Sequence, residues 1–182
     1  DSVTYEQFQN GLETLEKEGM TALVVDLRDN PGGNLDTVCQ ILDLLLPEGT
    51  IVYTEDKNGE RVDTKTSDDE HQFTKPLAVL VNGRSASASE VFSGAVQDYG
   101  TGTIIGTQTY GKGIVQTLYS LSDGSCLKLT TAQYFTPDGR NIHGEGITPD
   151  IVVEKSADDQ TDNQLEKAVE TVQNAVDGTE KE

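Results

Sequence analysis

Two short apolar runs constrain the fold more than any other feature of the sequence. One run extends from Ala22 to Leu27 and the other from Leu77 to Val81. Strands that are apolar on both faces are typical of a parallel sheet covered by helices. Each run is followed by a Gly- or Ser-rich turn and then by a segment with helical spacing of apolar residues. The repeated order of strand, loop and helix predicts an α/β fold with mostly parallel buried strands.

The remaining elements are predicted from periodicity and turn signals. A leading helix is expected to begin with Thr4 and Gln7 at capping-box spacing and to end near Gly19. Two later helices should end before Pro47 and near Tyr99. The final helix places Leu165, Val169, Val172 and Val176 on one face. Two hairpins are expected: 51–53 with Val62 across Asn58-Gly59, and 114–121 with 126–131 across Asp123-Gly124.

Composition narrows the classes of function. The chain has 13 Lys and Arg against 32 Asp and Glu, which gives a formal net charge of −19. Such a surface repels phosphate backbones and anionic lipids, so we expect no nucleic-acid binding and no membrane-surface binding. No apolar run approaches the roughly 20 residues of a membrane helix, and no signal peptide is visible. Cys39 and Cys126 both lie in apolar stretches, which predicts two buried free thiols.

We expect a single domain over residues 1–182. It divides into a leading helix (1–19), a core (20–154) and an acidic linker with a C-terminal helix (155–182). The chain opens at Asp1 without an initiator Met, so we expect it to be a piece of something longer.

The serine-rich turn Ser85–Ser89 is the first candidate for chemistry. It lies between a buried strand and the start of a helix, where free backbone N–H groups can hold an oxyanion. A serine there could act as a nucleophile in acyl transfer. The alternative interpretation is that Ser85, Ser87 and Ser89 only cap the helix, because serine is a preferred N-cap residue.

A nucleophilic serine needs a base, and three side chains are candidates. His71 lies in an acidic loop and is expected to be a solvated surface residue, whereas His143 lies in a Gly-rich segment that could approach a site. Lys112 stands between two glycines, whose backbone freedom could let its side chain turn inward. A lysine shielded from water favours the neutral form and can accept the serine proton. Composition alone does not choose among them.

Metal and phosphate sites are not predicted. Asp68-Asp69-Glu70 lacks the alternating ligands and central glycine of a calcium loop, and Asn30-Pro31-Gly32-Gly33 lacks the Gly-Lys-Ser/Thr ending of a phosphate-binding loop. We therefore expect no cofactor and no metal.

Three motifs in order resemble the C-terminal processing (tail-specific) peptidases. They are Leu27-Arg28-Asp29-Asn30-Pro31-Gly32-Gly33, Ser85-Ala86-Ser87-Ala88-Ser89-Glu90 and Tyr110-Gly111-Lys112-Gly113-Ile114-Val115-Gln116. The resemblance covers nearly the whole chain. It implies a crotonase-like or Clp-protease-like stack of ββα units.

The resemblance also implies roles for individual residues. Ser87 matches the nucleophile, Lys112 the general base of a Ser–Lys dyad, and Gln116 the residue that orients the lysine amine. Gly32 and Ala88 match the positions whose amides form the oxyanion hole. Asp98 matches an acidic position that is implicated in catalysis in some members. The alternative interpretation is that this carboxylate, at the end of a helix, holds a loop in place and does not move protons.

The family likeness implies a serine endopeptidase that cleaves protein or peptide substrates with apolar C-termini near those ends. It implies a location outside the cytoplasm, on the periplasmic or cell-surface side of a bacterial membrane. Family members usually carry a PDZ domain, absent from this chain, and we expect the full-length protein to have one and to carry a membrane anchor. Two alternatives are a non-catalytic ligand- or protein-binding domain of the same fold and a Ser–His hydrolase that uses His143.

Overall fold

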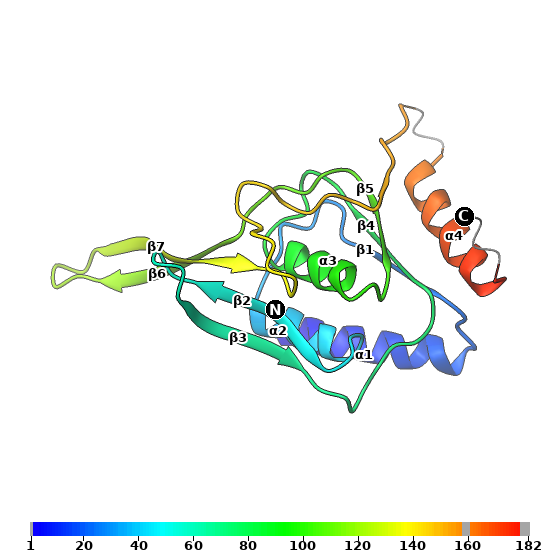
Figure 1. The fold of residues 1–182 in the computed structure, drawn as a ribbon, viewed down its shortest axis with the longest axis horizontal. Helices are drawn as coiled ribbons and strands as arrows, with labels where there is room; N and C mark the ends of the chain where they lie inside the picture. Colours follow the sequence, from blue (N-terminus) through cyan, green and yellow to red (C-terminus); the bar gives the residue numbers. More distant parts are fainter. Residues whose placement is uncertain (1, 158–160, 179–182) are drawn as a thin grey trace.

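Two four-stranded sheets organise the part of the chain that the computed structural model describes, residues 2–157 and 161–178 (Figure 1). The first sheet has the order β1-β4-β5-β8 and the second the order β3-β2-β7-β6. The strands are β1 (Leu23–Asp26), β2 (Gly49–Glu55), β3 (Arg61–Ser67), β4 (Leu77–Val81), β5 (Thr103–Gly106), β6 (Ile114–Ser120), β7 (Cys126–Phe135) and β8 (Ile151–Val152). The α/β class predicted from the sequence is confirmed.

The first sheet is parallel throughout and is covered by helices on both faces. Strand β4 pairs in parallel with β1 and with β5, and all five of its residues are buried. Leu77, Val79 and Val81 join the core under α2 (Leu35–Asp43) and α3 (Ala88–Asp98), whereas Ala78 and Leu80 pack with α4 (Asn163–Val176). Burial on two faces explains why this strand has no polar residue.

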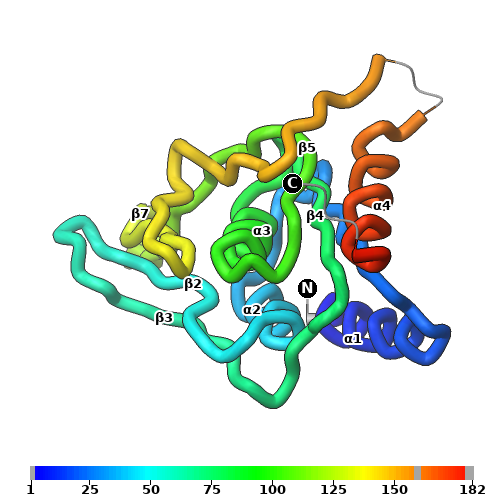
Figure 2. Tube along the Cα trace, turned by 45° about the vertical axis from the view of Figure 1, so that its right-hand side comes forward, coloured from blue at the N-terminus to red at the C-terminus, as the bar shows by residue number. Residues whose placement is uncertain are grey.

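The leading helix, α1, extends over Ser2–Lys17 and packs beside α2 (Figure 2). Phe8 and Leu12 contact the core, and Gly19 follows the helix with a φ of 87°. The predicted end of this helix is therefore confirmed. Its predicted capping box is wrong, because Thr4 lies inside the helix.

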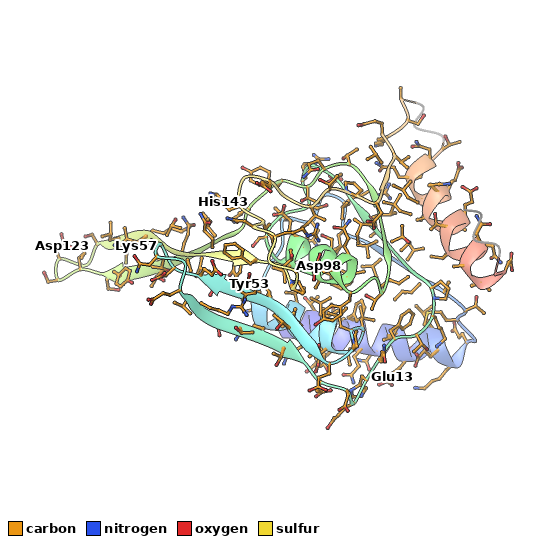
Figure 3. The ribbon with its side chains drawn as sticks, in the orientation of Figure 1. Glu13, Tyr53, Lys57, Asp98, Asp123 and His143 are labelled. Carbon is orange, nitrogen blue, oxygen red and sulfur yellow. The ribbon has the colours of Figure 1, made fainter. Side chains whose placement is uncertain are left out.

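The second sheet is antiparallel and contains both predicted hairpins. In Figure 1 the β6–β7 hairpin extends well away from the rest of the molecule, and Figure 3 labels Asp123 at its tip. Because this hairpin lacks a covering layer, Leu118 is 65% exposed and Cys126 is exposed. The prediction that Cys126 is buried is therefore wrong, whereas Cys39 is buried in α2, and burial raises the pKa of its thiol to about 12.

The packed face of α4 differs from the predicted one. Gln164, Ala168 and Val172 are buried against the parallel sheet, whereas Leu165 and Val169 are 40% and 50% exposed. The small Ala168 side chain lets the helix approach β4 and β5 closely. The predicted apolar stripe is therefore correct only at Val172. Residues 158–160 of the predicted acidic linker and the final residues 179–182 lie outside the described residues.

A guanidinium holds the start of α4 to the end of β1. Arg28 donates to both carboxylate oxygens of Asp162, the N-cap of α4, to Asp26, and to the side chain of Gln164. The Asp162 side chain also accepts a hydrogen bond from Leu165 N–H. These contacts attach the helix to the same loop that carries Gly32.

Acid is expected to release α4 before the rest of the fold. Hydrogen bonding to Arg28 lowers the pKa of Asp162 from 3.8 to about 2. A carboxylate with a depressed pKa stabilises the folded state above its unfolded pKa, and this contribution disappears between about pH 4 and pH 2. We expect the protection factors of the α4 amides, taken against the intrinsic exchange rate at each pH, to fall over that interval. In Asp162→Asn the exchange should already be fast at pH 6, and an unchanged rate there would contradict the assignment.

Among the described residues, no helix has both the length and the apolar character needed to cross a bilayer.

Candidate active site

Three loops meet at the carboxyl edge of the parallel sheet. The loop after β1 carries Gly32, the loop after β4 carries Ser87, and the loop after β5 carries Lys112. Because β1, β4 and β5 are adjacent and parallel, their carboxyl ends lie at the same edge. In α/β proteins ligands bind at this edge.

Hydrogen bonds fix the three loops to one another. Ser85 Oγ donates to Leu27 O over 2.7 Å, and Ala86 N–H donates to Asn30 O over 3.1 Å. Tyr110 N–H donates to Ser85 O over 3.0 Å, which joins the third loop to the second. The three motifs that are distant in sequence are therefore joined to one another by hydrogen bonds.

The three serines of the second loop are not equivalent. Ser85 is fully buried and bonded to Leu27, and Ser89 is 4% exposed and donates to Asn30 O over 3.1 Å. Ser87 is half-buried and lies just before α3, with φ 58° and ψ −116°. A non-glycine residue in this region stores about 1–3 kcal/mol of strain, and such strain concentrates at functional sites. The structure therefore singles out Ser87 as the serine at the open surface.

Glu90 is the residue that joins the serine loop to the lysine loop. Its side chain is fully buried and accepts four hydrogen bonds. One oxygen, Oε2, accepts from Ser87 N–H and from Lys112 N–H, each over 2.8 Å. The other, Oε1, accepts from Thr109 Oγ1 and from Gly111 N–H, each over 2.6 Å. A single carboxylate therefore sets the separation of the backbones of Ser87 and Lys112.

Sequence reasoning quoted Glu90 only as part of a motif and missed this role. A signal was present, because Ser87 and Glu90 have the spacing of a capping box, in which the glutamate returns to the N-cap amide. The bonds to Thr109, Gly111 and Lys112 join residues about 20 positions away. Only the tertiary fold reveals those bonds.

The backbone of Lys112 shares the Glu90 carboxylate with that of Ser87, but Lys112 is exposed. The prediction that its side chain is shielded from solvent is therefore wrong for this structure. The flanking glycines have a different use: Gly111 and Gly113 are buried, and a Cβ on Gly113 would lie 2.5 Å from His143 N. They let the backbone pack against residues 142–146 while the lysine remains at the surface.

Gln116 is exposed on β6, next to a bulge that separates Val115 from Gln116. Among the hydrogen bonds of the described residues, none joins its side chain to Lys112. Its predicted role in orienting the lysine amine stays a prediction.

Gly32 and Ala88 meet where an oxyanion hole is predicted. A Cβ on Gly32 would lie 2.7 Å from Ala88 N and 2.5 Å from Ala86 O, so this contact requires glycine. Gly32 N–H donates to Asn30 Oδ1 over 2.9 Å. To serve an oxyanion, this amide has to exchange the Asn30 oxygen for the substrate oxygen.

Substitution of Gly32 by alanine is expected to disable the site. The residue has a φ of 91°, which strains any L side chain, and its new Cβ would collide with backbone atoms. We expect a reaction that passes through an oxyanion at this site to slow by about 10²-fold, the cost of losing one oxyanion donor. Gly33→Ala is the matched control, because a Cβ there meets nothing within 4 Å. Equal activity in the two variants would contradict the role of Gly32.

Asp98 lies at the opposite end of α3 from Ser87 (Figure 3). Ten helical rises separate the two ends by about 15 Å. The Asp98 side chain is 3% exposed, forms an ion pair with Arg140 and accepts a hydrogen bond from Asp138 N–H over 2.9 Å. These contacts favour the loop-locking interpretation over a part in proton transfer.

The two histidines occupy different surroundings. His71 is exposed on the loop after β3, as predicted. His143 is exposed on the loop that packs against the lysine turn, where Gly144 N–H donates to Gly111 O over 2.9 Å. The alternative with His143 as the base stays a prediction for experiment.

Comparison with known proteins identifies the family. A family model described as peptidase family S41 matches residues 1–153. The chain belongs to peptidase family S41. The resemblance drawn from the three motifs is thereby confirmed.

Two S41 relatives and one solved structure show which part is shared. A carboxyl-terminal-processing protease from Synechocystis sp. is 44% identical over 151 residues, covering 83% of this chain and 35% of the relative. A carboxy-terminal-processing protease from Bartonella bacilliformis is 45% identical over 159 residues, covering 84% and 36%. The structure of a photosystem II D1 C-terminal processing protease superposes with a TM-score of 0.81 at 38% identity, covering 85% of this chain and 40% of that one. The chain thus spans about a third of the length of these curated relatives.

Proposed function

We propose that this S41 domain is a serine endopeptidase in which Ser87 is the nucleophile and Lys112 the general base. The observation that carries the proposal is the shared hydrogen bonding of Ser87 N–H and Lys112 N–H to one buried oxygen of Glu90. The strained backbone of Ser87 at the start of α3 and the contact of Gly32 with Ala88 add support.

The reaction proceeds in two halves. The neutral Lys112 amine accepts the Ser87 hydroxyl proton as Oγ attacks the scissile carbonyl carbon. The amides of Gly32 and Ala88 stabilise the oxyanion, and the lysine ammonium then gives its proton to the leaving nitrogen as the C–N bond breaks. Water attacks the acyl-enzyme, Lys112 accepts its proton, and that proton returns to Ser87 as the carboxylic acid leaves.

An exposed lysine makes a poor base at neutral pH, because water stabilises its charged form. We infer that bound substrate covers Lys112 and displaces water from it. We propose that the substrates are proteins cleaved near apolar C-termini, outside the cytoplasm. The part matched here is about a third of the relatives' length, and we propose that the full-length protein supplies a PDZ domain for substrate capture.

The comparisons do not favour the alternative candidate, a binding domain of the same fold without catalysis. The two candidates differ in a covalent step, and that step can be measured without knowledge of the natural substrate.

The test is turnover of an unfolded protein with an apolar C-terminus. We expect the parent chain to cleave it and Ser87→Ala to be inactive, with both proteins unfolding cooperatively at similar temperatures. Ser93→Ala is a control for loss of a hydroxyl on the same helix, because Ser93 bonds only to helix carbonyls and is fully buried. Equal turnover in the parent and Ser87→Ala would refute the nucleophile.

A further inference from the structure

The four arginines of the chain differ in how they use the outer nitrogens of the guanidinium, Nη1 and Nη2. Arg28 and Arg140 direct both nitrogens to acceptors within the fold, and their side chains are 16% and 42% exposed. Arg61 lies over the Tyr53 ring. The Arg84 side chain is 78% exposed, and among the described residues none accepts a hydrogen bond from its Nη1 or Nη2. Arg84 therefore offers two donors to a ligand.

Asp29 and Asn82 orient the Arg84 guanidinium from its other side. Asp29 Oδ1 accepts from Arg84 Nε over 2.6 Å and from Asn82 Nδ2 over 2.8 Å. Asn82 Oδ1 accepts in turn from Asp29 N–H over 3.1 Å and from Arg84 N–H over 2.9 Å. Asp29 has a φ of 61°, in the left-handed region that non-glycine residues rarely adopt. These bonds join the loop after β1 to the turn after β4 and leave Nη1 and Nη2 unused.

The turn that carries Arg84 belongs to the candidate active site. Arg84 directly precedes Ser85, whose carbonyl accepts from Tyr110 N–H of the lysine loop over 3.0 Å. Arg84 also lies three positions before Ser87, a step that spans at most about 10 Å when the chain is fully extended. An extended peptide rises about 3.3 Å per residue. A substrate group bound to Arg84 is therefore within a few residues of the scissile bond.

The charge around Arg84 is opposite to that of the whole chain. Hydrogen bonds from Asn82 and Arg84 lower the pKa of Asp29, and the positive charge of Lys155 lowers it further. Asp29, Arg84 and Lys155 together carry one net positive charge in a chain whose formal net charge is −19. Lys112 is exposed on the third loop of the same edge. An anionic group that the overall charge repels is attracted at this position.

We propose that Arg84 binds a carboxylate of the substrate, either the α-carboxylate at the chain end or the side chain of an Asp or Glu a few residues from the scissile bond. Two guanidinium donors match the two oxygens of a carboxylate in a bidentate pair. The inference rests on the proposed function, because it takes Ser87 as the place of cleavage. The contact selects substrates by charge, independently of any selection by apolar side chains.

Matched peptides measure this selection. They share one cleaved sequence, continue for one to five residues after the scissile bond, and are made as free acids and as C-terminal amides. We expect kcat/KM of the acid to exceed that of the amide by about fivefold at one or two adjacent lengths, the upper range for an exposed ion pair. The ratio should approach one in 1 M salt, where the Debye length is about 3 Å. Amides with a single Glu at each position within five residues of the scissile bond report a side-chain carboxylate in the same way.

Variants of Arg84 change the ratios in a graded way. Arg84→Ala should bring the acid-to-amide and Glu ratios to one, and Arg84→Glu should bring them below one. Arg84→Lys keeps the charge without the planar fork and should keep only part of the preference. Because each ratio compares two peptides on the same variant, a change in overall rate cancels. Lys57→Ala, which removes an exposed cation at the turn between β2 and β3 (Figure 3), is the matched control and should keep the parent ratios.

A fluorophosphonate keeps the two proposals apart, because this probe phosphonylates a nucleophilic serine and contains no carboxylate. A Ser87 adduct combined with parent ratios of one for every peptide, or with no peptide cleaved, would overturn the carboxylate site and leave the nucleophile standing. Ratios that survive Arg84→Ala, with acid and amide cleavage falling together, would show that Arg84 only stabilises the loop. Absence of both the adduct and cleavage would overturn both proposals.

Discussion

Lys112→Ala is expected to lose nearly all peptidase activity while remaining folded. Loss of a general base costs about 10²- to 10⁴-fold in rate, and the exposed side chain contributes little to packing. The measurement is the rate of Ser87 phosphonylation and of substrate cleavage across pH 6 to 10. In the parent the rate should rise toward alkaline pH, because a lysine has to lose its proton before it can accept one. The Lys112→Ala variant should lose that rise.

Lys112→Arg separates base chemistry from charge. Arginine keeps the positive charge but cannot be deprotonated in proteins, so we expect it to be as inactive as alanine. Lys128→Ala, on the neighbouring strand β7, controls for removal of an exposed lysine. Activity that survives Lys112→Ala would favour His143 as the base, since its loop packs against the lysine turn.

Glu90→Gln is expected to misplace the nucleophile and the base together. Oε2 accepts from two backbone N–H groups, and Oε1 accepts from one backbone N–H and from the Thr109 hydroxyl. Whichever oxygen the amide nitrogen replaces, at least one buried backbone N–H therefore faces a donor. A buried donor without its acceptor costs about 1–3 kcal/mol, so we expect a stability loss of about 3 kcal/mol and a fall in Ser87 labelling of at least about tenfold. Thermal unfolding and labelling at a temperature where the variant is folded provide the two readouts.

Asp98→Asn is the matched control for Glu90→Gln. Both side chains are carboxylates on α3 with little exposure, but Asp98 bonds to the loop at 138–140 instead of the lysine turn. We expect Asp98→Asn to lower stability and to keep the labelling rate of the folded protein. If Glu90→Gln lowers stability and leaves labelling unchanged, Glu90 has only a structural role.

The strands and loops of the site were predictable from local patterns. Leu77–Val81 is apolar on both faces, and this pattern identifies a central parallel strand because only such a strand is covered on both sides. The family motifs then bring Gly32, Ser87 and Lys112 to one edge, and the structure confirms that their loops meet there.

The wrong predictions concern the exposure of single side chains, which depends on how distant elements pack against one another. The exposure of Lys112 follows from the packing of Gly111 and Gly113 against residues 142–146, and the exposure of Leu165 follows from the packing of Ala168 against the sheet. Cys126 is exposed because its hairpin leaves the body of the molecule. Local periodicity reports which residues share a face, but it does not report which face meets the core.

Mapping the fluorophosphonate adduct by peptide mass spectrometry tests the central claim most directly. Three serines lie within five residues, and two of them are buried with hydroxyls bonded to the first loop. We predict a single adduct on Ser87, formed by the parent and lost in Lys112→Ala. An adduct on Ser85 or Ser89, or equal labelling of Ser87 without Lys112, would contradict a Ser87–Lys112 pair.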